Sequence, residues 1–359
     1  MDKKRKIPLF FIITSVLLAV SALFVALARS SYSTADFLTF SVGGVYRRAL
    51  AFLSDFIPFS LFELVIALLP FAMAFIIVLA VRAFRRGEGR IRLILSVTGI
   101  IFLLLSAYNV SMGTAYHTTP LSARLGLEVR EVDRDGLVTA MEKLVGEVNR
   151  LSDSVEFSDG VSEKDLTLDE LSVRISAAHS HFSESHGLGE GFDSRAKGMV
   201  ASPIMSLLGL TGIYTFYTGE ANVNLTYPTF DVAFTAAHEL SHQRGVLREN
   251  EANMLAFLVL YESGDEYLRY AAALTMIEYV GYALYQTDEA AYRDILSSLD
   301  ARAMGDLRAS SEVTKKYGGT ILADISDFFN DLFLKSNGTE GIVSYGMVVT
   351  LAVSYLNAE

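Results

Sequence analysis

The chain has 359 residues, of which 51% are hydrophobic, and its mean hydropathy of +0.35 predicts a membrane protein with a sizeable part outside the bilayer. The formal net charge of −11 argues against nucleic-acid binding, which requires a basic surface. The chain has no cysteine, which excludes disulfides and thiolate metal sites, so any metal must be held by histidine and carboxylate ligands.

Three apolar stretches near the N-terminus are each long enough to cross a bilayer, at about residues 7–28, 58–81 and 93–112. A basic head, residues 1–6, precedes the first stretch, for which a cleaved signal peptide is the alternative interpretation. Five arginines crowd a predicted loop at residues 82–92. Because positively charged loops stay in the cytoplasm, we expect both basic segments inside and everything after Tyr116 outside.

Residues 116–359 are predicted to form one mostly α-helical domain outside the membrane, after a membrane region of residues 1–115. A β-branched and aromatic run predicts a strand at 213–217, followed by a turn and a second strand at 221–224. The apolar run 347–356 is too short to span a bilayer and predicts a core helix. Apolar periodicity and capping residues predict further helices at 45–56, 129–151, 167–186, 266–285, 289–298 and 301–330.

Two local expectations concern side chains within this domain. His179, His181 and His186 do not share one helical face, so we expect surface histidines rather than metal ligands. Thr229 follows a proline at the start of a helical run, where its hydroxyl is expected to act as an N-cap.

Residues 238–242 read H-E-x-x-H within an apolar, helix-forming run. The spacing places the imidazoles of His238 and His242 on one helical face, where two nitrogens can bind one Zn²⁺ ion. Glu239 would then lie beside the metal as the general base of a hydrolytic reaction. The alternative is a set of polar residues at a core boundary. The apolar surroundings, the helix-breaking Gly245 and the acidic segment that follows favour zinc.

The third ligand must come from beyond this helix. Arg248 stands where some metalloproteases place a third histidine, and a cation cannot bind zinc, so Glu249 and Glu251 remain. Residues 249–253 read Glu-x-x-Ala-Asn, which resembles a signature of gluzincin metallopeptidases, whose ligand is the first glutamate. We prefer Glu249, with Glu251 as the alternative. Four residues on, Asn253 is expected to hydrogen-bond the metal ligands.

Segments spread over the whole chain carry a family resemblance, namely the three apolar stretches and residues 116–125, 211–214, 218–224, 238–245, 249–253 and 334–346. Through them the chain resembles an uncharacterised bacterial membrane family, domain of unknown function 3810. The resemblance to gluzincins is narrower and covers about residues 213–260. Together they imply a gluzincin-like (zincin-like) zinc domain anchored in the membrane, and no known substrate.

The expected function is a zinc-dependent metallopeptidase in a bacterial membrane, acting on a peptide or protein of the cell envelope. The alternative is a non-catalytic sensor or scaffold that zinc stabilises. A transporter is a weaker third reading, because the apolar stretches carry few charges beyond Glu63. Tyr345, in a Ser-Tyr-Gly sequence, is a candidate donor to the developing oxyanion, and a packed core tyrosine is the alternative.

Overall fold

The computed structural model describes residues 7–86, 89–189, 191–337 and 345–358. Most of them are helical, and two small sheets accompany the helices, in agreement with the mostly α-helical prediction. The chain forms two compact units, which are described separately. Unit 1 comprises Met1–Thr118 together with Thr215–Gly219, and unit 2 comprises Thr119–Tyr214 and Glu220–Glu359.

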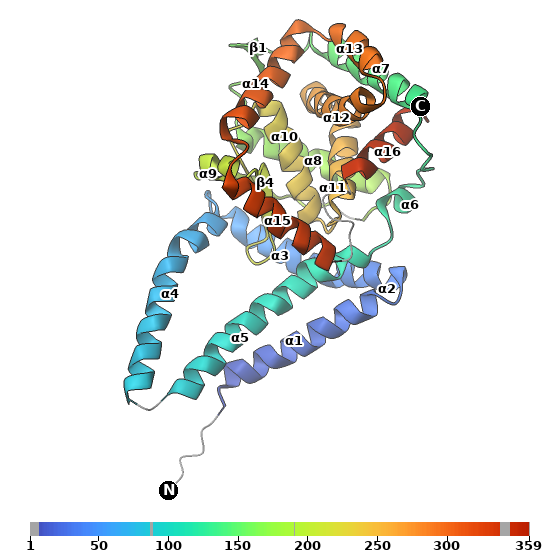
Figure 1. The fold of residues 1–359 in the computed structure, drawn as a ribbon. Helices are drawn as coiled ribbons and strands as arrows, with labels where there is room; N and C mark the ends of the chain where they lie inside the picture. The colour runs from blue at the N-terminus through green and yellow to red at the C-terminus, as the bar shows by residue number, and fades with distance from the viewer. Residues whose placement is uncertain (1–6, 87–88, 190, 338–344, 359) are drawn as a thin grey trace. The chain divides into compact units, whose positions relative to one another are not determined.

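Unit 1 contains three helices that are long and apolar enough to cross a membrane. They are α1 (Leu9–Ala28), α4 (Leu61–Arg86) and α5 (Arg90–Tyr108), and the third candidate span runs on to His117. α1 and α5 lie side by side (Figure 1). The predicted arginine-rich loop is wrong in extent, because three of its arginines end α4 and two begin α5. Arginine is a good helix former, and its long side chain can carry the charge away from the apolar stretch.

Short helical segments lie between α1 and α4 and after α5. Arg47 is buried, and its guanidinium donates to the carbonyl oxygens of Thr39 and Ser111, each at 2.8 Å. Both carbonyls lie in π-helical turns, whose altered backbone bonding is often found where a helix is adapted to a local need. The segments are α2 (Tyr32–Asp36), the π-helix Phe37–Gly43, α3 (Gly44–Asp55), the π-helix Asn109–Gly113 and the 3-10 turn Ala115–His117.

The segment Thr215–Gly219 belongs to unit 1 although it lies far along the chain. The hydroxyl of Tyr46 donates to the carbonyl of Phe216 at 3.2 Å, and the ring of Tyr108 meets that of Phe216 edge to face at 5.6 Å. Gly219 has φ +73°, and a Cβ there would lie 2.5 Å from that of Leu50. A glycine is therefore required at this position of the turn.

Unit 2 is built around α10, α11 and α12, which pack against one another (Figure 1). Every residue of α11 after its first is buried. Val348 and Ala352 are fully buried, which confirms the predicted C-terminal core helix. The helices are α6 (Leu121–Leu125), α7 (Arg134–Leu151), α8 (Leu168–Ser185), α9 (Ser202–Leu207), α10 (Thr229–Gln243), α11 (Glu249–Tyr261), α12 (Glu266–Thr287), α13 (Glu289–Ser297), α14 (Ala301–Tyr317), α15 (Ile321–Ser336) and α16 (Tyr345–Leu356).

Two predictions about these helices are wrong. The single helix predicted at 301–330 is two helices, α14 and α15, because Gly318 and Gly319 separate them, the second with φ +68°. His179 does not lie on the surface with His181 and His186; it is fully buried, and its Nε2 lies 3.0 Å from the carbonyl oxygen of Ala237 in α10. Complete burial lowers the pKa of His179 well below its usual value, and the charge of Arg244 lowers it further.

The larger sheet of unit 2 has the strand order β3-β5-β4. β3 (Ala196–Gly198) runs parallel to β5 (Glu220–Val223), which is buried throughout, and β4 (Gly212–Thr215) is the strand at the other edge. β4 and β5 confirm the predicted pair of strands, whereas β3 was not predicted. A second, antiparallel pair joins β1 (Phe157–Ser158) to β2 (Val161–Ser162).

Candidate metal centre

Helix α10 carries both histidines of the motif. Its apolar face is buried along its whole length, from Phe230 through Ala237 to Leu240. The predicted cap is wrong: Thr229 is the first helical residue, Pro228 precedes it in the N-cap position, and no side chain caps this end. A proline fits there because the first backbone N–H groups of a helix have no intrahelical partner.

The end of α10 shapes the site. Gly245 adopts φ +97°, its N–H donates to the carbonyl of His242 at 2.9 Å, and the N–H of Val246 donates to the carbonyl of Ser241 at 3.1 Å. This pair of bonds is the Schellman cap, which needs a left-handed residue and therefore favours glycine. The chain reverses within a few residues and begins α11 at Glu249, opposite the histidines it has just left.

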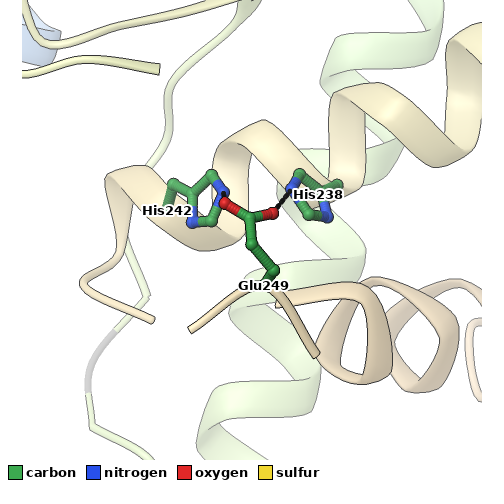
Figure 2. Close-up of side chains that lie close together, drawn as sticks. All are labelled: His238, His242 and Glu249. Carbon is green, nitrogen blue, oxygen red and sulfur yellow. Dashed lines mark ion pairs between the residues drawn. The ribbon is translucent and has the colours of Figure 1, made fainter. Parts of the chain in front are cut away.

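The side chains of His238, His242 and Glu249 converge between α10 and α11. Figure 2 shows the carboxylate between the two imidazoles, with one oxygen toward each ring. The Nε2 atoms of His238 and His242 lie 3.2 Å and 3.6 Å from the Glu249 oxygens. A ligand atom from each of the three residues lies within 4.8 Å of the others. The side chains are 14%, 9% and 19% exposed, so the group is largely enclosed.

The second ring nitrogen of each imidazole, Nδ1, forms a hydrogen bond within the protein. Nδ1 of His238 lies 2.8 Å from Oδ1 of Asn253, and Nδ1 of His242 lies 2.8 Å from the carbonyl oxygen of Val246. Both partners are oxygens that only accept, so Nδ1 carries the proton and donates, which leaves the Nε2 lone pair for a cation. Histidine ligands of metals are oriented in this way in known sites.

His242 and Glu249 also influence each other's protonation. Burial lowers the pKa of His242, but the nearby charge of Glu249 and its hydrogen bond outweigh burial and raise that pKa to about 9. Burial raises the pKa of Glu249, yet the charge of His242 and the hydrogen bonds of both imidazoles lower it overall. The Glu249 carboxylate therefore favours a positive charge at the imidazole of His242, where a metal cation would also be stabilised.

Glu239 is buried on the side of α10 that faces β4. A backbone hydrogen bond from Tyr214 reaches its carboxylate, whereas Oε2 is buried without a hydrogen-bond partner. At Gly212 a Cβ would lie only 2.5 Å from Oε1 of Glu239 and 2.7 Å from Cγ2 of Thr235. Burial raises the pKa of Glu239 above its usual value, although the charges of His238 and His242 oppose this. A raised pKa suits a carboxylate that must accept and release a proton near neutral pH.

The alternative third ligand, Glu251, has other partners. Glu251 directs Oε1 to the guanidinium of Arg248 at 2.6 Å and to the backbone N–H of Leu121 at 3.1 Å. Its carboxylate thus holds the start of α11 to α6. Tyr345 is the first residue of α16, and its side chain lies outside the part that the structure describes.

Sequence reasoning missed three contributors. Tyr214 and Val246 act through backbone atoms, which no residue pattern reveals. Gly212 did carry a signal, because a glycine inside a strand pattern marks a close approach of another backbone or side chain. The side chain that closely approaches Gly212 is that of Glu239.

The sequence of the chain matches a protein-family model. That model has the description "Protein of unknown function (DUF3810)" and matches residues 42–353. No curated protein matches the chain, and no solved structure matches it.

Proposed function

The chain belongs to the family described as "Protein of unknown function (DUF3810)", and because that description assigns no activity, we propose from the site itself that the protein is a membrane-anchored, zinc-dependent metallopeptidase. One observation carries the proposal. Two imidazole Nε2 atoms and the Glu249 carboxylate converge within 4.8 Å, and the buried Glu239 beside them keeps one oxygen without a partner.

The donor set fits zinc. His238, His242 and Glu249 would hold the ion, because two histidines and one carboxylate are the three protein ligands of a known class of hydrolytic zinc site. Asn253 and the Val246 carbonyl already fix the orientation of both imidazoles. When bound, zinc supplies Lewis acidity, which makes a water molecule a stronger acid and polarises a substrate carbonyl.

The chain's own residues would then handle protons and substrate. Glu239 takes the proton of the attacking water at its unpartnered Oε2 and gives it to the leaving amine, while the Tyr214 N–H holds the carboxylate in place. β4 is an edge strand that contacts Glu239 through Gly212. An extended peptide pairing with such an edge would lie beside the metal ligands.

The compartment follows from charge and chain order. The arginines at the ends of α4 and α5 favour the cytoplasm, and so does the basic N-terminal head. Three spans from a cytoplasmic N-terminus place unit 2 outside the cytoplasm. The substrate is therefore a peptide or protein of the cell envelope, and the lipid bilayer is the anchor.

A matched set of variants tests this proposal against a zinc-stabilised scaffold without activity. Purified full chain is assayed with a fluorogenic peptide library while zinc content and melting temperature are measured. Glu239→Gln should lose about 10²–10⁴-fold in hydrolysis and keep zinc and melting temperature, because only the base is removed. His238→Ala should lose zinc as well. Hydrolysis that survives in Glu239→Gln would show that the activity does not arise from this site. If the wild-type chain binds zinc, has a lower melting temperature after chelation and cleaves no peptide, the protein is the zinc-stabilised scaffold.

A further inference from the structure

Helix α15 exposes an apolar face. Among the described residues, no other helix of unit 2 exposes more than two large apolar side chains, whereas α15 exposes seven within its 16 residues. At 100° per residue they occupy an arc of about 140° of the helix circumference. We call them the α15 apolar face, and they are Ile321, Leu322, Ile325, Phe328, Phe329, Leu332 and Phe333.

The rest of unit 2 contacts the opposite side of the helix. Thr320 donates its hydroxyl to the carbonyl of Leu207 at 2.6 Å, and a Cβ at Gly209 would lie 3.7 Å from that of Ala323. Leu334 is buried, and Ser326 and Asn330 on the same side are partly buried. Apart from Leu334, the helix therefore turns small and polar side chains inward and its large apolar ones outward, which is the reverse of a helix on a water-soluble domain.

We infer that the α15 apolar face lies in the interfacial layer of the membrane, as an in-plane helix. The same chain carries three candidate spans, and unit 2 begins at Thr119, two residues after the third span ends at His117. Unit 2 is thus tethered next to a bilayer surface. An amphipathic helix that presents phenylalanine and leucine to such a surface buries them among the headgroups and the first acyl carbons.

Charge indicates which lipid surface is involved. The third side of α15 carries Asp324, Asp327 and Asp331, and its one cation, Lys335, is paired with Asp331 at 2.6 Å. Attraction to anionic lipids therefore does not drive binding, in contrast to basic interfacial helices. The tether replaces that attraction, because it holds the helix at a high effective concentration near the membrane. The occupant is accordingly an uncharged or zwitterionic lipid layer.

Because the chain contains neither tryptophan nor cysteine, a single introduced tryptophan or cysteine is the only residue of its type and can be followed by fluorescence or by labelling. Phe328→Trp places a single fluorophore on the α15 apolar face, and Tyr282→Trp places one at a side chain of α12 that is 69% exposed. The full chain is reconstituted into phosphatidylcholine nanodiscs with or without bromine atoms on the upper acyl carbons. Phe328→Trp should emit at shorter wavelength than Tyr282→Trp, and bromine should quench only Phe328→Trp.

A second pair of variants tests the exposure of the α15 apolar face by chemical labelling. Ile325→Cys lies on the α15 apolar face and Asp327→Cys on its acidic side, so a charged maleimide should label Asp327→Cys faster in the same nanodiscs. Emission from Phe328→Trp that bromine does not quench overturns the inference, whether the residue is in water or against another protein. Protection of Ile325→Cys that vanishes when each disc holds one copy would assign the face to a second copy of the chain instead.

Discussion

Glu249 and Glu251 stand two residues apart at the start of α11 and have different tasks. The carboxylate of Glu249 meets both imidazoles, whereas that of Glu251 accepts from Arg248 and Leu121. Because these partners do not overlap, the two roles can be separated by substitution.

We predict that Glu249→Gln removes most of the zinc, since it replaces an ionised ligand with a neutral amide. Glu251→Gln should retain zinc and lower the melting temperature, because Arg248 loses a buried anionic partner. Metal analysis and thermal unfolding of the two purified variants measure both effects. The assignment is wrong if Glu251→Gln alone empties the site.

His179 predicts a pH dependence of stability. Its folded pKa lies well below the unfolded value of about 6.5, because burial disfavours the imidazolium. The unfolded chain therefore binds more protons below pH 6.5, and stability is lost as the pH falls through that value, by up to about 1.4 kcal/mol per pH unit. In His179→Gln, thermal unfolding between pH 5 and 7 should show a smaller decline. The control is His181→Gln, an exposed histidine on the same helix, which should keep the wild-type profile.

At the scale of elements, the contact between β4 and α10 determines where the Glu239 carboxylate points. A methyl group at Gly212 would collide with Oε1 and Cγ of Glu239, at 2.5 and 2.7 Å, so either the strand or the carboxylate must move. We predict that Gly212→Ala lowers peptide hydrolysis while zinc content stays near the wild-type level. Gly264→Ala is the control, because a Cβ there meets nothing within 4 Å. Equal activity of the two variants would contradict this role for β4.

Elements with a strong local signal were predictable from the sequence. The H-E-x-x-H spacing fixes the relative position of His238 and His242 on any helix, and Gly245 marks where that helix ends. The apolar run of α16 is short, which distinguishes it from the candidate membrane spans. These features depend on neighbouring residues along the chain, so the pattern alone contains them.

Features that depend on tertiary contacts were not predictable. β3 is three residues long and owes its existence to pairing with β5. His179 is buried because α8 packs against α10, and nothing in the spacing of three histidines distinguishes it from His181. The contacts of Glu239 with the Tyr214 backbone and with Gly212 come from a strand that is distant in sequence. A residue pattern does not show which backbone group donates to a side chain, so the Tyr214 contact appeared only in the structure, and the glycine at position 212 indicated a close approach without showing that Glu239 makes it.

At the scale of the whole molecule, the proposed orientation makes a direct prediction. A reporter that is active only outside the cytoplasm should be active when fused after Glu359 and inactive when fused at Gly87, between α4 and α5. The reason is that the basic N-terminal head and the arginines around that junction resist export. The opposite pattern of activities would place the candidate metal centre in the cytoplasm and remove the envelope as the source of substrate.

The turn Thr215–Gly219 determines whether unit 2 can be separated from unit 1 without damage. A fragment that starts near residue 116 would keep this turn but lose Tyr46 and Tyr108, which hold Phe216. β4 leads directly into the turn, so such a fragment would loosen the strand that supports Glu239. The part of the chain that carries the candidate metal centre could therefore not simply be transplanted onto another anchor or trimmed to a soluble form.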